Sequence, residues 1–263
     1  MNPSLSSFLP VPPSSRRHWL QSTLASGAGL STAAALGLLQ ACGGSEAHAG
    51  PVFSEQTGFP AFFEQAPVLR MRDPLAEFLG AAEGGLMTYR YVDAVRLAGH
   101  SCPTVAGAYL MVLQGLRALY GAELPERGGV EVSMRDGRED GVTGVVAAMA
   151  TLLTGAASEG GFPGMGAARR FSRKQLLRYQ VGMSGVLALR RRDTGQAVQA
   201  RINHDLVPWT EEMKALMPKA IGQQATPAEL QRFAYLWQER VRQMLIDHAD
   251  DPQLVQVEPW AAA

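Results

Sequence analysis

The chain has 263 residues, with 24 basic and 24 acidic side chains and therefore a formal net charge of zero. This balance gives no electrostatic reason to expect nucleic acid or an anionic lipid surface as a partner. Hydrophobic residues make up 46% of the chain, which is enough to build the full core of a globular protein.

The first 49 residues have the features of an export signal. Residues 14–21 (SSRRHWLQ) carry paired arginines, and a weakly apolar run rich in Ala, Gly and Ser follows them. A basic region before a run of moderate hydrophobicity is typical of a signal peptide, and the arginine pair favours twin-arginine export over an ordinary secretory signal. The run is too short and too rich in glycine to predict a membrane span.

Two cleavage sites are compatible with this signal. The segment LQAC, which ends at Cys42, resembles a bacterial lipoprotein box, and residues 47–49 (AHA) match a signal-peptidase site. We favour lipidation of Cys42 because a flexible Gly-Gly-Ser tether follows it. Either site predicts a periplasmic domain whose membrane contact is limited to a lipid anchor at Cys42. Either also leaves Cys102 without a disulfide partner.

From residue 50 onward the pattern predicts an α+β domain with an antiparallel or mixed sheet packed on buried apolar helices. Residues 51–74 form an expected extended lead-in, and residues 75–99 have the apolar spacing of a helix. Pro103 opens an almost wholly apolar segment that ends before Gly121, as expected for a buried helix.

Later segments complete this domain. Residues 129–136 alternate like a half-buried strand, and residues 141–156 predict a second apolar helix. Two further apolar runs enclose Asp193-Thr194-Gly195, which predicts a β-hairpin.

The end of the chain predicts a helical extension. Thr226, Pro227 and Glu229 form a capping box. The side chains expected on one face of that helix are Leu230, Phe233, Trp237, Val241, Met244 and His248. The predicted organisation is therefore a signal and tether over residues 1–49, an α+β domain over 50–208 and the extension over 209–263.

His100 and Cys102 are the candidate metal ligands. Cys102 directly precedes the buried helix, where unpaired backbone N–H groups and the helix dipole favour the thiolate. A thiolate and an imidazole suit one transition metal ion, best zinc, with nickel or copper as alternatives. A third ligand has to come from elsewhere, and Glu139, Asp140 and His204 are the candidates. The alternative interpretation is an inert buried cysteine beside a hydrogen-bonded loop histidine.

The order of these elements resembles the FmdE-like family, named after the E-subunit of formylmethanofuran dehydrogenase, over roughly residues 86–207. The resemblance lies in GHSCP before an apolar helix, a later strand, a Gly-rich helix and RRRDTGQAVQARI. It implies that His100 and Cys102 bind metal in a metal-handling or accessory module. Ala98, Thr104 and Ala156 stand where family members have His, Gly and often Cys. The resemblance therefore implies that an oxygen ligand, a second imidazole or the other subunit of a homodimer completes the site.

Two other functions stay open. Cys102, activated by His100 and the helix terminus, would make the protein an enzyme with a cysteine nucleophile. Alternatively, the protein is a structural lipoprotein that docks on a partner through its C-terminal helix. Residues 169–180 and 189–193 are basic and fit an anion or partner surface, although a solvated face is the simpler interpretation at zero net charge.

Overall fold

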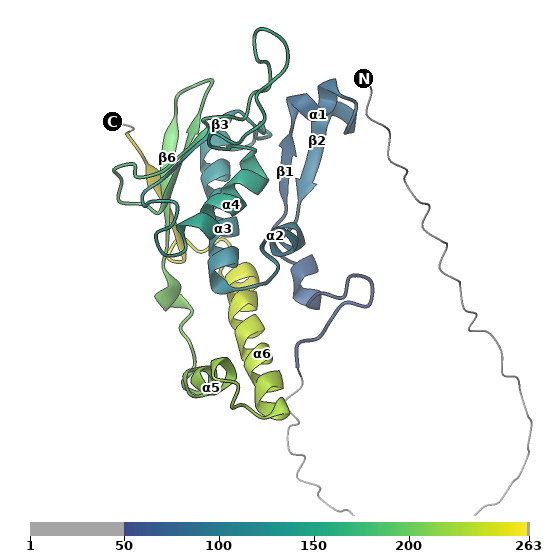
Figure 1. Cartoon of the computed structure of the whole chain (residues 1–263), viewed down its shortest axis with the longest axis vertical. Helices are drawn as coiled ribbons and strands as arrows, with labels where there is room; N and C mark the ends of the chain where they lie inside the picture. Colours follow the sequence, from purple (N-terminus) through teal and green to yellow (C-terminus); the bar gives the residue numbers. More distant parts are fainter. Residues whose placement is uncertain (1–49, 262–263) are drawn as a thin grey trace, which may run out of the picture. The chain divides into compact units, whose positions relative to one another are not determined.

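The computed structural model describes residues 50–261, so the predicted signal, the arginine pair and Cys42 lie outside the described residues. The described part confirms the predicted α+β class, since its helices accompany two separate sheets (Figure 1). The smaller sheet pairs β1 (Leu69–Arg72) with β2 (Leu86–Tyr89) in antiparallel orientation. The larger sheet has the strand order β4-β3-β5-β6-β7.

The larger sheet is mixed, as predicted. Its strands are β3 (Val130–Met134), β4 (Leu177–Arg178), β5 (Leu187–Arg191), β6 (Ala197–Ile202) and β7 (Val255–Pro259). Only the β3–β4 pair is parallel among these described strands. The predicted hairpin is confirmed, because β5 and β6 pair in antiparallel orientation across the Asp193-Thr194-Gly195 turn. Strand β7 was not predicted; it places the end of the supposed helical extension inside the same sheet.

Helix α3 (Pro103–Tyr120) forms the centre of the core, as its apolar sequence predicts. It packs on β5, β6 and β7 with one side and on α4 (Thr143–Thr154) with another. Two glycines allow this close approach. A Cβ at Gly107 would lie 2.6 Å from Ile202 Cδ1, and one at Gly115 would lie 2.7 Å from Leu189 Cδ1. A larger residue at either position would have to displace that methyl group from the helix–sheet contact.

The helical spacing over residues 75–99 gave a wrong prediction. That segment contains α1 (Pro74–Phe78), a 3₁₀ turn (Glu83–Gly85), β2 and α2 (Tyr91–Ala98). The cause is the glycine pair Gly84 and Gly85, which takes positive φ angles of 58° and 66°. A side chain at Gly85 would collide with the Asp73 carbonyl. Phe78 is 55% exposed, so its apolar spacing marks no buried face.

The C-terminal helices pack into the same compact unit as the sheet. They are α5 (Glu211–Ile221) and α6 (Pro227–Arg242), and a π-helical turn (Gln243–Asp247) continues α6. The capping box is confirmed: the Glu229 N–H donates to Thr226 Oγ1, and the Thr226 N–H donates to Glu229 Oε2. Val241 and Met244 are buried in the chain's own core, so these two positions of the expected docking face are already covered. None of the described helices is long and apolar enough to cross a membrane.

Candidate functional site

His100 lies in the short connection between α2 and α3. Helix α2 ends at Gly99 with a left-handed φ of 74°, which turns the chain and leaves the imidazole exposed. His100 Nδ1 lies 3.0 Å from the Ala98 carbonyl oxygen. Because a carbonyl can only accept, this hydrogen bond requires the proton on Nδ1, and Nε2 is the acceptor of that tautomer. The backbone therefore fixes both the tautomer and the direction of this histidine.

Cys102 occupies a different environment. It is the N-cap of α3, where its Sγ accepts a hydrogen bond from the Val105 N–H at 3.4 Å. The residue is only 8% exposed and belongs to the hydrophobic core. Burial also raises the pKa of the neighbouring Tyr91, against the opposing effect of its hydrogen bond to Ser101. The thiol is thus directed to the helix terminus and shielded from solvent.

The other predicted ligands lie on separate elements. Asp140 Oδ2 accepts the Gly137 N–H at 2.8 Å, which closes the turn before α4, and Glu139 is exposed in that turn. Across residues 50–261, no three His, Cys, Asp or Glu side chains come close enough to hold a metal ion. The described residues therefore supply His100 and Cys102 with no third ligand, and they do not form a complete metal site.

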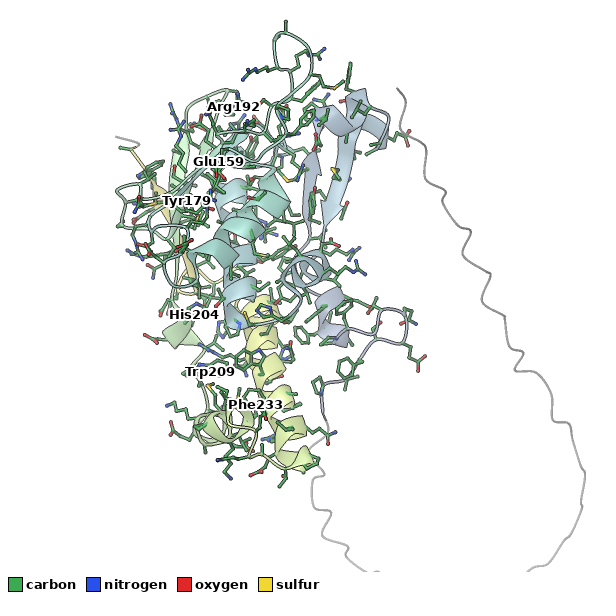
Figure 2. The ribbon with its side chains drawn as sticks, viewed as in Figure 1. Glu159, Tyr179, Arg192, His204, Trp209 and Phe233 are labelled. Atoms are coloured by element: carbon green, nitrogen blue, oxygen red, sulfur yellow. The ribbon has the colours of Figure 1, made fainter. Side chains whose placement is uncertain are left out.

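His204 (labelled in Figure 2) packs on the second turn of α3, beside Gly107. Burial lowers the pKa of its imidazole, and the positive charge of Arg240 lowers it further, while Asp205 acts in the opposite direction. Its Nδ1 is buried without a hydrogen-bond partner among the described residues. The lowered pKa therefore favours the neutral imidazole at this half-buried position, and its role as a ligand stays a prediction.

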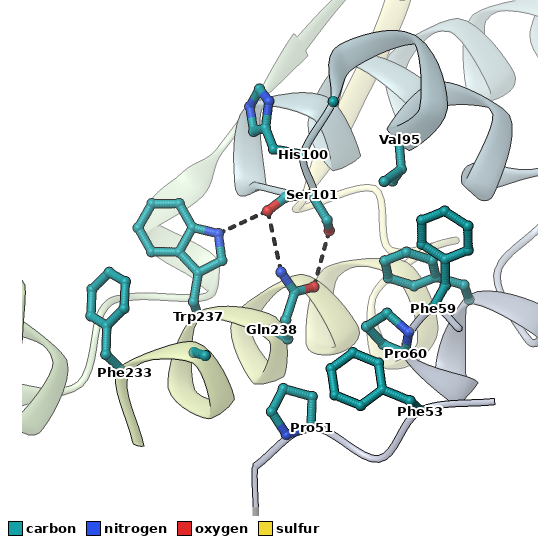
Figure 3. Close-up of a pocket in the computed structure, with 13 residues that line it drawn as sticks. Pro51, Phe53, Phe59, Pro60, Val95, His100, Ser101, Phe233, Trp237 and Gln238 are labelled. Carbon is teal, nitrogen blue, oxygen red and sulfur yellow. Dashed lines mark hydrogen bonds between the residues drawn. The ribbon is translucent and has the colours of Figure 1, made fainter. Parts of the chain in front are cut away.

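An aromatic pocket opens beside His100 (Figure 3). It has a volume of about 460 Å³ and lies between the lead-in, the α2–α3 connection and α6. Its aromatic rings are Phe53, Phe59, Phe63, Phe233 and Trp237. Its polar side chains are His100, Ser101 and Gln238, and none of its lining residues is an Asp, Glu, Lys or Arg.

Ser101 is the hydrogen-bond partner of most polar groups in the wall of the aromatic pocket. Its carbonyl accepts from Trp237 Nε1 at 2.9 Å and from Gln238 Nε2 at 3.3 Å (Figure 3). Its hydroxyl donates to Gln238 Oε1 at 3.0 Å and, 2.9 Å away, accepts from the Tyr91 hydroxyl. These groups bond to one another, whereas His100 Nε2 forms none of the hydrogen bonds found among the described residues.

Ring contacts hold the aromatic pocket in shape. Phe63 packs on Tyr91 edge to face, with ring centroids 4.9 Å apart. On the other wall, Trp237 lies 5.5 Å from Phe233 and 5.0 Å from Trp209. Aromatic side chains have few rotatable bonds, so a packed set of them keeps its shape without a ligand. The pocket is therefore largely preformed, except at Phe53, which is 57% exposed.

Comparison with known proteins adds only a weak structural similarity. No protein-family model matches the chain, and no curated protein matches it. Among solved structures, it is similar to a tungsten formylmethanofuran dehydrogenase FmdE-like protein from Syntrophus aciditrophicus. The sequence identity is 13% and the TM-score 0.35, over 66% of this chain and 74% of that chain. A similarity of this size is at most a weak family link, and it assigns no role to any residue.

His100 stays a predicted metal ligand. Phe233 and Trp237 were expected on one face of the C-terminal helix, but the pocket that they form with the Phe side chains of the lead-in was not predicted. A signal was present, since residues 51–67 are rich in Phe and Pro, and Phe233 and Trp237 stand four residues apart on α6. The missing information was tertiary: the lead-in folds back against α6, and no local pattern in either segment indicates that contact.

Proposed function

We propose that the chain is a binding protein for a neutral, aromatic small molecule that occupies the aromatic pocket. The observation that carries this proposal is a largely preformed cavity of about 460 Å³ with five aromatic rings and no formally charged side chain. Small-molecule sites have volumes of roughly 300–1,000 Å³, mostly apolar walls and a few polar groups that orient the ligand. A charged ligand would lose its hydration here without gaining a counter-ion, which disfavours it.

His100 would orient this ligand. Its Nε2 has no described partner and could accept a hydrogen bond, and the surrounding Ser101, Trp237 and Gln238 are already bonded to one another. A ligand N–H or O–H placed at Nε2 keeps a partner on leaving water, whereas a ligand without a donor leaves Nε2 unpaired. The pocket should therefore prefer aromatic molecules that carry one hydrogen-bond donor.

The test is a fluorescence titration of the purified protein with N-phenylnaphthylamine, a neutral aromatic probe with a single N–H. We expect saturable one-to-one binding that Phe233→Ala weakens about tenfold, because a ring in the pocket wall is lost. Phe78→Ala is the matched control, since Phe78 is exposed and lies outside this pocket. Binding that does not saturate, or that both variants weaken equally, would contradict the proposal.

A second probe isolates the role of His100. Phenylnaphthalene has similar rings but no N–H group. His100→Ala should weaken N-phenylnaphthylamine binding by about fivefold to tenfold, the equivalent of one hydrogen bond, and leave phenylnaphthalene binding nearly unchanged. An equal loss for both probes would show that His100 acts only through packing.

A metal ion on His100 is a second candidate function. The specific observation is that Nδ1 donates to a backbone carbonyl and leaves Nε2 free, which is how metal-binding histidines are commonly oriented. The remaining ligands would come from a bound molecule or from the other subunit of a homodimer. Metal analysis should then find about one equivalent of zinc, nickel or copper per chain, lost in His100→Ala and kept in His248→Ala. Metal-free protein from the native compartment would reject this candidate.

Cys102 as an enzyme nucleophile stays a prediction. Its burial and its bond to the Val105 N–H give a reagent little access from the aromatic pocket. Alkylation of the folded protein should therefore be much slower than alkylation in denaturant. Rapid labelling of the folded protein would revive the nucleophile hypothesis.

Export also stays a prediction. We propose a periplasmic protein anchored through a lipid on Cys42, supported by the sequence of the first 49 residues. Mass spectrometry of the N-terminus of the mature protein distinguishes lipidated Cys42 from a free terminus after Ala49.

A further inference from the structure

Four arginines surround a second cavity, distant from the aromatic pocket. It has a volume of about 270 Å³, and Arg72, Arg127, Arg173 and Arg192 are among its lining residues. In Figure 2, Arg192 lies in the upper part of the described molecule and Phe233 in the lower part. Arg173 and Arg192 belong to the two basic stretches noted in the sequence, which the fold brings together here.

Positive charge exceeds negative charge around this arginine cavity. Asp73 pairs with Arg173 at 2.6 Å and with Arg127 at 3.1 Å, so one carboxylate serves two guanidinium groups. The Asp73 and Arg173 side chains are only 5% and 7% exposed. Arg192 donates to the Gly128 carbonyl at 3.0 Å and forms no ion pair within residues 50–261.

The remaining carboxylates do not remove this excess. Glu77 pairs with Arg72, and Glu126 also lines the cavity. Four guanidinium groups therefore meet three carboxylates, which leaves one positive charge. Burial lowers the pKa of Arg173, Asp73 opposes that effect, and the nearby Arg127 cation lowers the pKa by a smaller amount. An anion bound in the cavity would relieve this repulsion.

Two guanidinium N–H groups in this cluster have no partner. The Nε atoms of Arg127 and Arg173 are buried, and neither forms a hydrogen bond to any described residue. A buried N–H group without an acceptor is costly, so such groups usually bind water, an ion or a ligand oxygen. The two orphan donors belong to arginines that line the same cavity.

The backbone is specifically shaped around these arginines. Any side chain at Gly128 would collide with the guanidinium group of Arg173, so only glycine leaves room for it. Phe171, which also lines the cavity, has a left-handed φ of 63°, uncommon for an aromatic residue. Its ring packs 5.3 Å from that of Phe78 and 4.7 Å below the Arg170 guanidinium. Strain of this kind collects at ligand sites.

We propose that the arginine cavity binds a small oxyanion, the phosphate or carboxylate group of a ligand. The planar fork of a guanidinium group matches both kinds of oxyanion, and an oxyanion has enough acceptors for several arginines at once. It would neutralise the excess charge and accept hydrogen bonds from the guanidinium groups that line the cavity. This site is independent of the aromatic pocket, which carries no formal charge.

The test measures thermal unfolding of the purified protein in sodium phosphate, sodium acetate and sodium chloride at equal ionic strength. We expect a saturable rise in melting temperature with phosphate or acetate beyond that with chloride. A response to phosphate identifies a phosphate group, and a response to acetate alone identifies a carboxylate. No saturable response to either anion overturns the proposal.

Two matched pairs of variants assign the effect to this cavity. Arg192→Gln should weaken anion binding about tenfold, the effect of one charged hydrogen bond. Arg190→Gln, on the same hairpin but paired with Glu131 at 3.8 Å, should leave it unchanged. Arg72→Gln and Arg70→Gln repeat the comparison on β1, because only Arg72 lines the cavity. Equal weakening within each pair would show general charge screening and overturn the proposal.

Discussion

The aromatic pocket and the arginine cavity differ in whether their polar groups already have hydrogen-bond and charge partners. In the aromatic pocket, Ser101, Trp237 and Gln238 bond to one another, so the wall behaves as an apolar surface. In the arginine cavity, the Nε–H groups of Arg127 and Arg173 have no described partner and one positive charge is in excess. Whether the polar groups are already paired therefore indicates the ligand class better than the number of polar groups does.

The largest expected loss of stability comes from breaking the ion network of the arginine cavity. Asp73→Ala should lower the free energy of unfolding by about 3–5 kcal/mol, because Arg173 would stay buried without its counter-ion. Urea denaturation measures this. Asp250→Ala is the control: Asp250 is 78% exposed in its pair with Arg117, and its loss should cost less than about 1 kcal/mol. Equal effects would mean that the network is well hydrated.

A smaller effect is expected in the wall of the aromatic pocket. Ser101→Ala should cost about 1–3 kcal/mol, because the buried Tyr91 hydroxyl loses its acceptor. Ser184→Ala, which removes an exposed hydroxyl, should cost a few tenths of a kcal/mol. Combined with Tyr91→Phe, Ser101→Ala should destabilise by less than the sum of the two changes. Strict additivity would contradict a shared hydrogen bond.

Mild acid should destabilise the protein in part through the half-buried His204. The folded-state pKa of His204 lies below its ordinary value of 6.5, so under mildly acidic conditions the unfolded chain binds a proton that the folded chain does not. This contribution to stability is complete above pH 6.5 and declines as the pH falls below it. Urea midpoints between about pH 7.5 and about pH 5.5 should fall less steeply in His204→Gln. An unchanged slope would assign the acid sensitivity to other groups.

The smallest effect tests the neutrality of the aromatic pocket. Arg96 lies 5.6 Å over the outer ring Phe59, but it does not line the pocket. Arg96→Gln should therefore change probe binding less than about twofold, since an exposed cation–π contact contributes at most about 1 kcal/mol and mainly to the fold. A large change in affinity would show that the cation takes part in recognition.

Local sequence predicted the elements whose causes are local. Pro103 and Gly121 delimit α3, and Thr226 with Glu229 starts α6, because helix caps depend on neighbours within one turn. Spacing failed over residues 75–99, where a contact between Gly85 and the Asp73 backbone decides the chain path. The caps of a helix can be predicted from the sequence, whereas such a contact cannot.

The candidate sites were less predictable for the same reason. His100 was singled out by its proximity to Cys102 in the sequence. In the fold, however, His100 is exposed beside the aromatic pocket and Cys102 is buried in the core. The aromatic pocket joins Phe53 to Trp237, and the arginine cavity joins Arg72 to Arg192. Each combines segments more than a hundred residues apart, which no pattern in either segment reveals. The basic stretches were noted, but their convergence on one cavity follows only from the fold.

Strand β7 has a consequence for how the protein is made. It covers the edge of β6, from which roughly fifty residues separate it along the chain. At a translation rate of about 5–20 residues per second, the edge of β6 therefore stays unpaired for about 3–10 s until β7 has been synthesised. A bare edge can recruit a strand from a neighbouring nascent chain. Ribosome spacing and chaperone supply should thus govern the soluble yield of this protein.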